Sequence, residues 1–147
     1  MLFLSTFTNN IDPKGRVSVP GGFRSCALSE QFQGVVLYRS FTADCIEGVT
    51  MSRLEKIALA ADNLDIFGKE LDDLSALLFA DARPLQFDVA GRIVIPAELL
   101  KHANIKDTAL FVGRGNSFQI WNPEKFKQSL SKSLATLQKS RPEFKIV

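Results

Sequence analysis

A segment of nine residues occurs twice in this chain, and the repeat constrains the fold more than any other feature. The first copy runs from Asp12 to Pro20 (DPKGRVSVP) and the second from Asp88 to Pro96 (DVAGRIVIP). Both the aspartates and the prolines lie 76 residues apart (88 − 12 and 96 − 20), which is about half of the 147-residue chain. Internal repetition at this spacing indicates two copies of one structural module.

Each copy predicts a tight turn followed by a short strand. Asp, Pro and Gly at the first, second and fourth positions of DPKG match the preferences of a type I turn, and a left-handed glycine often completes such a hairpin loop. The residues after the glycine, 16–19 and 92–95, predict return strands that end at a proline. A proline there also suits the first turn of a helix. The expected turn-forming residues are Asp12, Gly15, Asp88 and Gly91.

Both halves of the chain show the same order of elements, which is a hairpin, a short helix, a second hairpin and a helix. Further strands are predicted at residues 2–8, 34–38, 45–47, 83–87, 109–112 and 118–121. Helices are predicted at 97–103, from a capping box at Ser52 and Glu55, and from Asn122-Pro123 to about Lys139. Between the halves, residues 64–79 predict one amphipathic helix with an apolar stripe of Leu71, Leu74, Leu77 and Leu78.

The organisation that follows is mainly β with packed helices. Residues 1–60 and 82–140 form two pseudo-symmetric half-units, residues 61–81 contain the connecting helix, and residues 141–147 are a short tail. Half-units of this kind leave strand edges and apolar faces exposed unless they pair. We therefore expect one compact pseudo-dimeric domain in which the two halves share a β core.

Composition places the chain among globular proteins and restricts its chemistry. Hydrophobic residues make up 46% of the chain and charged residues 23%, which argues against wholesale disorder. The net charge of +2 is not that of a histone-like protein, so a nucleic-acid partner requires positive charge that is concentrated locally or multiplied by assembly. Two cysteines and one histidine are too few for a four-ligand zinc site, and no cofactor is expected.

The expected location is the cytoplasm. The apolar N-terminus, residues 1–7, lacks the positively charged start of a signal peptide and instead predicts a strand. No window approaches the roughly 18–20 apolar residues of a membrane span, so no membrane partner is expected. Two cysteines allow one disulfide at most, and reduced thiols are the better interpretation.

The arginine that follows each glycine has two interpretations. In the structural one, Arg16 and Arg92 pair with the aspartate of their own turn. In the functional one, they bind an anionic partner. Turn geometry explains the repeated glycine but does not require an arginine on the following strand, and Lys14 is replaced by Ala90 in the second copy. Persistence of the arginine favours the functional interpretation.

Double-stranded DNA is the partner that this arrangement suits best. Arginine presents a planar fork that fits phosphate oxygens or the O6/N7 edge of guanine, and a two-stranded β-ribbon fits the major groove. Lys14 and Arg24 are expected to form a local basic patch with the first turn, whereas Ala90 makes the second turn less positive. The candidate DNA-binding residues are Arg16, Lys14, Arg92 and Arg24.

Enzymatic chemistry has little support in the sequence. Asp12 and Asp88 each lie near their own arginine, which favours a plain ionised carboxylate over a metal ligand or a general acid. No P-loop or dinucleotide fingerprint occurs, and no nucleophile motif surrounds His102. Trp121 and the twelve phenylalanines are interpreted as core residues. We expect neither an enzyme nor a small-molecule substrate.

The duplicated motif, Asp-x-x-Gly-Arg-[Val/Ile]-x-[Val/Ile]-Pro, resembles that of the MraZ family of bacterial proteins, and the resemblance covers essentially the whole chain. It implies the swapped-hairpin, double-split β-barrel fold of AbrB-like DNA binders. It also implies a nucleoid-associated, ring-shaped homo-oligomer that binds short G-rich direct repeats in promoters of the division and cell wall gene cluster, including its own. The family's DNA-contacting arginine corresponds to Arg16 and Arg92, with Lys14 and Arg24 as supporting contacts.

Two other functions are compatible with the same residues. A ring-forming scaffold would bind an acidic protein through its arginine turns and would show no preference for promoter DNA. An antitoxin of the AbrB or MazE type would neutralise a toxin. Such antitoxins usually have one copy of the motif and a long disordered tail, whereas two copies and a short tail are expected here.

Overall fold

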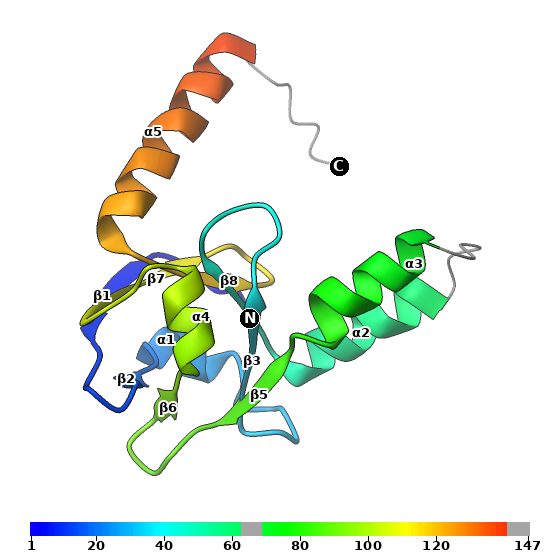
Figure 1. The fold of residues 1–147 in the computed structure, drawn as a ribbon. Helices are drawn as coiled ribbons and strands as arrows, with labels where there is room; N and C mark the ends of the chain where they lie inside the picture. Colours follow the sequence, from blue (N-terminus) through cyan, green and yellow to red (C-terminus); the bar gives the residue numbers. More distant parts are fainter. Residues whose placement is uncertain (63–68, 141–147) are drawn as a thin grey trace.

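The computed structural model describes residues 1–62 and 69–140 of the chain. The strands in these residues are β1 (Thr6–Asn10), β2 (Arg16–Ser18), β3 (Gly34–Arg39), β4 (Ile46–Val49), β5 (Arg83–Gln86), β6 (Arg92–Val94), β7 (Thr108–Gly113) and β8 (Phe118–Trp121). Six of them form an antiparallel sheet in the order β1-β7-β8-β4-β3-β5, which does not close on itself. The other two, β2 and β6, pair as a separate ribbon at one end of the barrel (Figure 1).

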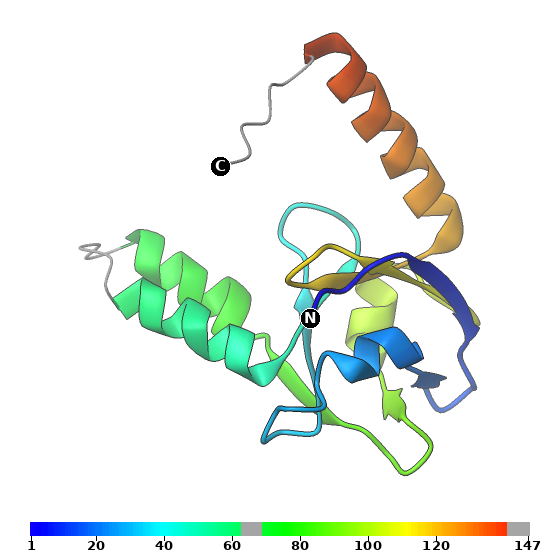
Figure 2. The ribbon, with the colours of Figure 1, turned by 180° about the vertical axis from the view of Figure 1, so that it is seen from behind.

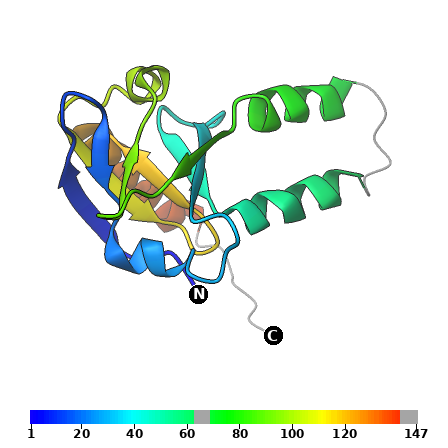
Figure 3. The ribbon, with the colours of Figure 1, turned by 90° about the horizontal axis from the view of Figure 1, so that it is seen from below.

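Short helices cover the sheet and longer helices project from it. Their bounds are α1 (Gly21–Ser25), α2 (Met51–Asp62), α3 (Lys69–Leu74), the π-helix η1 (Ser75–Phe79), α4 (Ala97–His102) and α5 (Pro123–Ser140). The α1 and α4 helices begin directly after Pro20 and Pro96 and bury Phe23 and Leu99 in the core. Viewed from below, α2 and the α3–η1 segment project from the same side of the barrel (Figure 3). The α5 helix extends away from the sheet, as both faces of the molecule show (Figures 1 and 2).

The two halves exchange their first strands. β1 pairs with β7 of the second half, and β5 pairs with β3 of the first half. β4 and β8 join the halves at the centre of the sheet, and β2 pairs with β6 in the ribbon. The sheet is therefore symmetric with respect to the two halves. Replacing each strand by its counterpart in the other half gives the same strand order, read in the opposite direction. This is the double-split β-barrel that the family resemblance implies, and the prediction of a mainly β fold with packed helices is confirmed.

The centre of the β2–β6 ribbon coincides with the repeat. Val17 pairs with Ile93, and these two residues lie 76 positions apart (93 − 17). Both side chains are about 1% exposed and belong to the main core. The repeated motif therefore supplies the core of the barrel as well as its turns.

A cluster of phenylalanines packs with the aliphatic residues of the core. The rings of Phe23 and Phe118 lie 5.3 Å apart, and Phe3 contacts both of them. Trp121 is 5% exposed and packs on Phe126 at the start of α5, with ring centroids 5.7 Å apart. Burial of these rings agrees with their interpretation as core residues. Phe7 and Phe41 are 39% and 56% exposed, so the interpretation of all twelve phenylalanines as core residues is wrong for these two.

Several sequence predictions need correction. The first strand begins at Thr6 and not at residue 2, and Phe3 forms only an isolated bridge to Gly115. The first strand and the return strand of each motif do not pair with each other, because each pairs with a strand of the other half. Alternating polarity identifies a strand but does not select its partner.

The predicted capping box at Ser52 is also wrong. Thr50 caps α2 by accepting the amide of Arg53 at 3.3 Å, and the amide and hydroxyl of Ser52 donate to Glu30 at 2.7 Å each. Of the helix predicted at 64–79, residues 69–79 are α3 followed by η1, and residues 64–68 lie outside the described part. The predicted tail at 141–147 also lies outside it.

Candidate nucleic-acid interface

The first turn is held by the side chain of Asp12. One carboxylate oxygen accepts the amides of Lys14 and Arg16, both at 2.9 Å, and the other accepts the guanidinium Nε of Arg16 at 2.6 Å. The amide of Gly15 donates to the carbonyl of Asp12 at 2.9 Å, and Gly15 has a φ of +85°, which glycine adopts without strain. The turn predicted from the sequence is confirmed.

The second turn repeats this geometry with different intervening residues. Asp88 accepts the amides of Ala90 and Arg92 at 2.9 Å each, and the Nε of Arg92 at 2.8 Å. Gly91 has a φ of +76°. In both turns the arginine pairs with its own aspartate, so the contact of the structural interpretation is present. That contact does not exclude a second partner, because it uses one nitrogen of each guanidinium.

The aspartates are held in the ionised form. The amide of Arg16 lowers the pKa of Asp12, and the Arg16 guanidinium lowers it further. The amide of Arg92 and its guanidinium lower the pKa of Asp88 in the same way. Both aspartates are ionised and already accept hydrogen bonds from their own turn. They therefore hold the arginines in place and are poor candidates for acid–base chemistry.

The arginines lie on one outward face of the β2–β6 ribbon. Arg16 is opposite Val94 and Ser18 is opposite Arg92, whereas the intervening pair, Val17 and Ile93, points into the core. Directly opposed residues share a face, so we call the set Arg16, Ser18, Arg92 and Val94 the arginine ribbon. The two arginines occupy a cross-strand diagonal, a spacing of roughly 7–8 Å at the level of the backbone.

The arginine ribbon is accessible and has free hydrogen-bond donors. The side chains of Arg16 and Arg92 are 39% and 40% exposed, and Val94 is 53% exposed. Within residues 1–62 and 69–140, no hydrogen bond from the Nη groups of either arginine is present. Those Nη groups supply the paired N–H donors that a phosphate or a guanine edge accepts. The outward positions of Ser18 and Val94 were missed in the sequence analysis, although the period-two pattern of a strand predicts them.

Each turn is hydrogen-bonded to the chain that follows the ribbon strand of the other half. The amide of Ile95 donates to the carbonyl of Gly15 at 2.9 Å, and the amide of Val19 donates to the carbonyl of Gly91 at 3.1 Å. Each turn is therefore fixed by the strand of the opposite half. This cross-bonding fixes the relative position of the two arginines.

The remaining candidates, Lys14 and Arg24, are separated. Lys14 is exposed on the first turn. Arg24 does not lie beside it, because its guanidinium packs over Gly91 of the second turn and its Nη1 donates to the carbonyl of Val19 at 3.1 Å. The expected patch of Lys14 and Arg24 at one turn is thus divided, with one cation at each turn.

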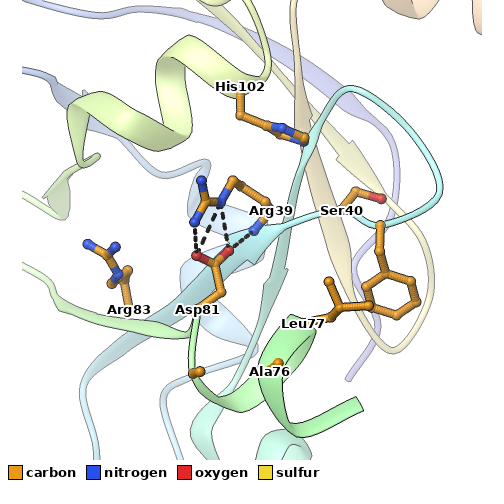
Figure 4. Close-up of a pocket in the computed structure, with 9 residues that line it drawn as sticks. Arg39, Ser40, Ala76, Leu77, Asp81, Arg83 and His102 are labelled. Atoms are coloured by element: carbon orange, nitrogen blue, oxygen red, sulfur yellow. Dashed lines mark hydrogen bonds and ion pairs between the residues drawn. The ribbon is translucent and has the colours of Figure 1, made fainter. Parts of the chain in front are cut away.

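A cavity that shares no lining residue with the arginine ribbon lies elsewhere on the molecule. It has a volume of about 450 Å³ and lies between β3, η1 and α4 (Figure 4). Its arginines are paired with carboxylates: Arg39 with Asp81 at 2.6 Å, and Arg83 with Glu98 at 2.8 Å. The cavity therefore offers no surplus charge to an anionic ligand.

The cysteines show no sign of reactivity. Cys26 and Cys45 are both free thiols. Burial raises the pKa of Cys45 to about 12, so its nucleophilic thiolate is scarce near neutral pH. Among the residues that the structure describes, no cluster of three His, Cys, Asp or Glu side chains offers a metal site, and no helix is long and apolar enough to cross a bilayer.

The fold and this surface define a class of protein. Two swapped hairpins share one split barrel, and their turns present a pair of framed arginines on an outward β-ribbon, as in the AbrB-like group of DNA binders.

Comparison with known proteins gives the family. The family described as "MraZ protein, putative antitoxin-like" matches residues 78–143. A protein of Rickettsia bellii named "Transcriptional regulator MraZ" is 43% identical over 131 residues, which is 88% of this chain and 87% of the relative. A protein of the same name from Pelagibacter ubique is 46% identical over 129 residues, which is 86% of this chain and 83% of the relative. The chain belongs to the MraZ family, whose named members are transcriptional regulators and not enzymes.

Proposed function

We propose that this chain is a sequence-specific DNA-binding regulator of transcription that places the arginine ribbon in the major groove of promoter DNA. The main support is the placement of Arg16 and Arg92 on one outward face of a two-stranded ribbon, each framed by its own aspartate. A two-stranded ribbon fits the major groove, and a bidentate arginine selects guanine. Short G-rich sequences are therefore the proposed target.

The supporting cations have a different task from the arginines of the ribbon. Lys14 lies on the first turn, and the guanidinium of Arg24, a residue of α1, lies over the second. Neither is on the ribbon face, so we assign both to backbone phosphates. Phosphate contacts fix the position of a protein on the duplex, and base contacts provide the specificity.

Assembly strengthens the binding of each ribbon. A ribbon makes only a few contacts, which alone give weak affinity. A ring-shaped homo-oligomer aligns several ribbons with direct repeats, and effective concentration then raises the overall affinity by as much as about 10²–10⁴. Such an assembly reconciles DNA binding with a net charge of only +2 per chain.

The α5 helix supports self-association. Leu130, Leu134 and Leu137 follow one another at helical spacing and are 56%, 56% and 48% exposed. No residue of α5 is buried. Because most helices in proteins are stabilised by packing of an apolar face, a second copy of the chain is the proposed cover for these leucines.

The proposed targets are direct repeats upstream of the division and cell wall gene cluster, including the protein's own promoter, so the protein would act at the nucleoid in the cytoplasm. DNase footprinting on the DNA upstream of its own gene tests this directly. We expect protection of evenly spaced, short G-rich repeats at moderate salt.

Uniform or absent protection would contradict the proposal. Such a result, together with capture of an acidic protein by the wild-type chain but not by Arg16→Ala, would favour the scaffold or antitoxin-like alternative.

A further inference from the structure

The two turns differ in their own positive charge. Lys14 is exposed on the first turn, and the equivalent residue of the second turn, 76 positions later, is Ala90. By sequence alone the second turn retains only the charge of Arg92, which Asp88 already neutralises. A symmetric contact with DNA would require another cation at the second turn.

Arg24 lies where that cation is needed. A Cβ added at Gly91 would meet the Cζ and Cδ of Arg24 at 2.7 and 2.8 Å, and it would meet the Nη1 still more closely. The guanidinium thus rests directly on the glycine of the second turn. It lines a depression of about 350 Å³ together with Asp88, Ala90 and Gly91. The absence of a side chain at Gly91 makes this approach possible.

This cation has no counterpart at the first turn. The residue 76 positions after Arg24 is Leu100, which packs against the main core. A Cβ at Gly15 would instead meet the carbonyl oxygen of Ile95 at 2.8 Å. Arg24 therefore adds a cation at the second turn only, whereas Lys14 adds one at the first turn only.

The lining of the depression beside Arg24 contains one carboxylate, that of Asp88, which Arg92 already pairs.

We propose that Arg24 gives the second turn the phosphate-contacting cation that Lys14 gives to the first, so that the two turns are matched in charge by residues from different positions. One half of the chain thereby completes the DNA contact of the other half. This inference rests on the proposed DNA binding. It changes the expectation from the sequence that the second turn is less positive than the first.

Arg24 also has a structural contact, and the test must separate the two roles. Its Nη1 donates to the carbonyl of Val19, which is a neighbour of the turn. A purely structural arginine would change stability but not the number of counterions released from DNA. Loss of one phosphate contact lowers the magnitude of the slope of log affinity against log salt by about 0.9.

The experiment is a salt titration of binding to a duplex from the protein's own upstream region, with five chains. These are the wild type, Arg24→Leu, Ala90→Lys in the Arg24→Leu background, Arg92→Ala and Arg16→Ala. Leucine is chosen because it occupies the equivalent position, 100, in the second half. Lysine at position 90 restores a cation at the place equivalent to Lys14.

We expect Arg24→Leu to weaken binding and to lower the slope by about 0.9 for each second turn that contacts DNA, and we expect Ala90→Lys to restore the slope. An unchanged slope in Arg24→Leu, or a loss that Ala90→Lys does not restore, overturns the inference. If Arg92→Ala and Arg16→Ala also leave binding unchanged, the proposed DNA binding fails as well. If those two variants bind weakly and only Arg24→Leu is silent, the failure belongs to Arg24 alone.

Discussion

The residues of the repeated turn have two roles: some form the turn, and the arginine is available to bind a partner. Asp12 accepts two amides and Gly15 adopts a positive φ, so these two residues form the loop itself. The Nε of Arg16 donates one hydrogen bond within the turn, and its Nη groups are left to donate to a partner. An exposed ion pair of this kind contributes little to stability, so replacing the arginine should leave the fold intact.

Substitution of Gly15 tests how much the turn conformation contributes to stability. We expect Gly15→Ala to lower the free energy of unfolding by at least about 1–2 kcal/mol, because alanine is strained at a φ of +85° and its Cβ would crowd the carbonyl of Ile95. Urea denaturation measures the change. Gly22→Ala is the matched control, since nothing lies within 4 Å of a Cβ there and alanine favours a helix. Equal stability of Gly15→Ala and the wild type would refute this account of the turn.

The aspartates make the turns sensitive to acid. Their folded-state pKa values are lowered, so their stabilisation is complete above the ordinary Asp range of about pH 4 and is lost as the pH falls through the lowered values. We expect an Asp12→Asn, Asp88→Asn double variant to show a weaker decline of stability with falling pH in this window. Thermal unfolding between about pH 5 and 2 measures it, and parallel curves for the two proteins would contradict the prediction.

At the scale of elements, the sequence predicts most strands and helices but not their partners. The turns, β7, β8 and the Asn122 cap of α5 follow from local patterns, since they depend on neighbouring residues. The exchange of β1 and β5 between halves does not, because period-two polarity fits many partners; only the family resemblance implied it. The arginines were identifiable by repetition. The position of Arg24 was not, because it depends on how the two halves pack.

The junction of η1 and β5 depends on one carboxylate. Asp81, which is 9% exposed, accepts the amide of Arg39 at 2.8 Å and its Nη2 at 2.6 Å, which lowers the pKa of Asp81 (Figure 4). Hydrogen bonds to charged groups contribute about 1.5–3 kcal/mol. We expect Asp81→Asn to lower the free energy of unfolding by an amount in the lower half of this range, because the Arg39 side chain is 46% exposed.

Urea denaturation measures the cost of Asp81→Asn. Its control is Lys127→Ala, which removes a fully solvated ion pair with Glu124 and should change stability by less than about 0.5 kcal/mol. Similar effects of the two substitutions would show that Asp81 does not anchor the junction.

At the scale of the whole molecule, DNA contact and assembly are assigned to different ends. The arginine ribbon lies at the lower end of the barrel in Figure 1, and α5 extends from the opposite end. We therefore expect the two proposed functions to be separable by mutation.

The leucines of α5 test the assembly. We expect Leu134→Glu to dissociate the homo-oligomer, because it places a charge within the apolar stripe that a second copy is proposed to cover. Sedimentation velocity measures the mass. Ala135→Glu adds the same charge to the same helix beside the stripe and should leave the mass unchanged. A wild-type chain that sediments as a monomer would contradict the assembly proposal outright.

The most direct test of the central claim is a binding titration of the Arg16→Ala, Arg92→Ala double variant. Affinity is measured for the upstream duplex and for an unrelated duplex of the same length, with assembly state and circular dichroism as controls. We predict that the double variant keeps its fold and its mass but loses its preference for the upstream duplex. An unchanged preference would show that the arginine ribbon does not recognise DNA.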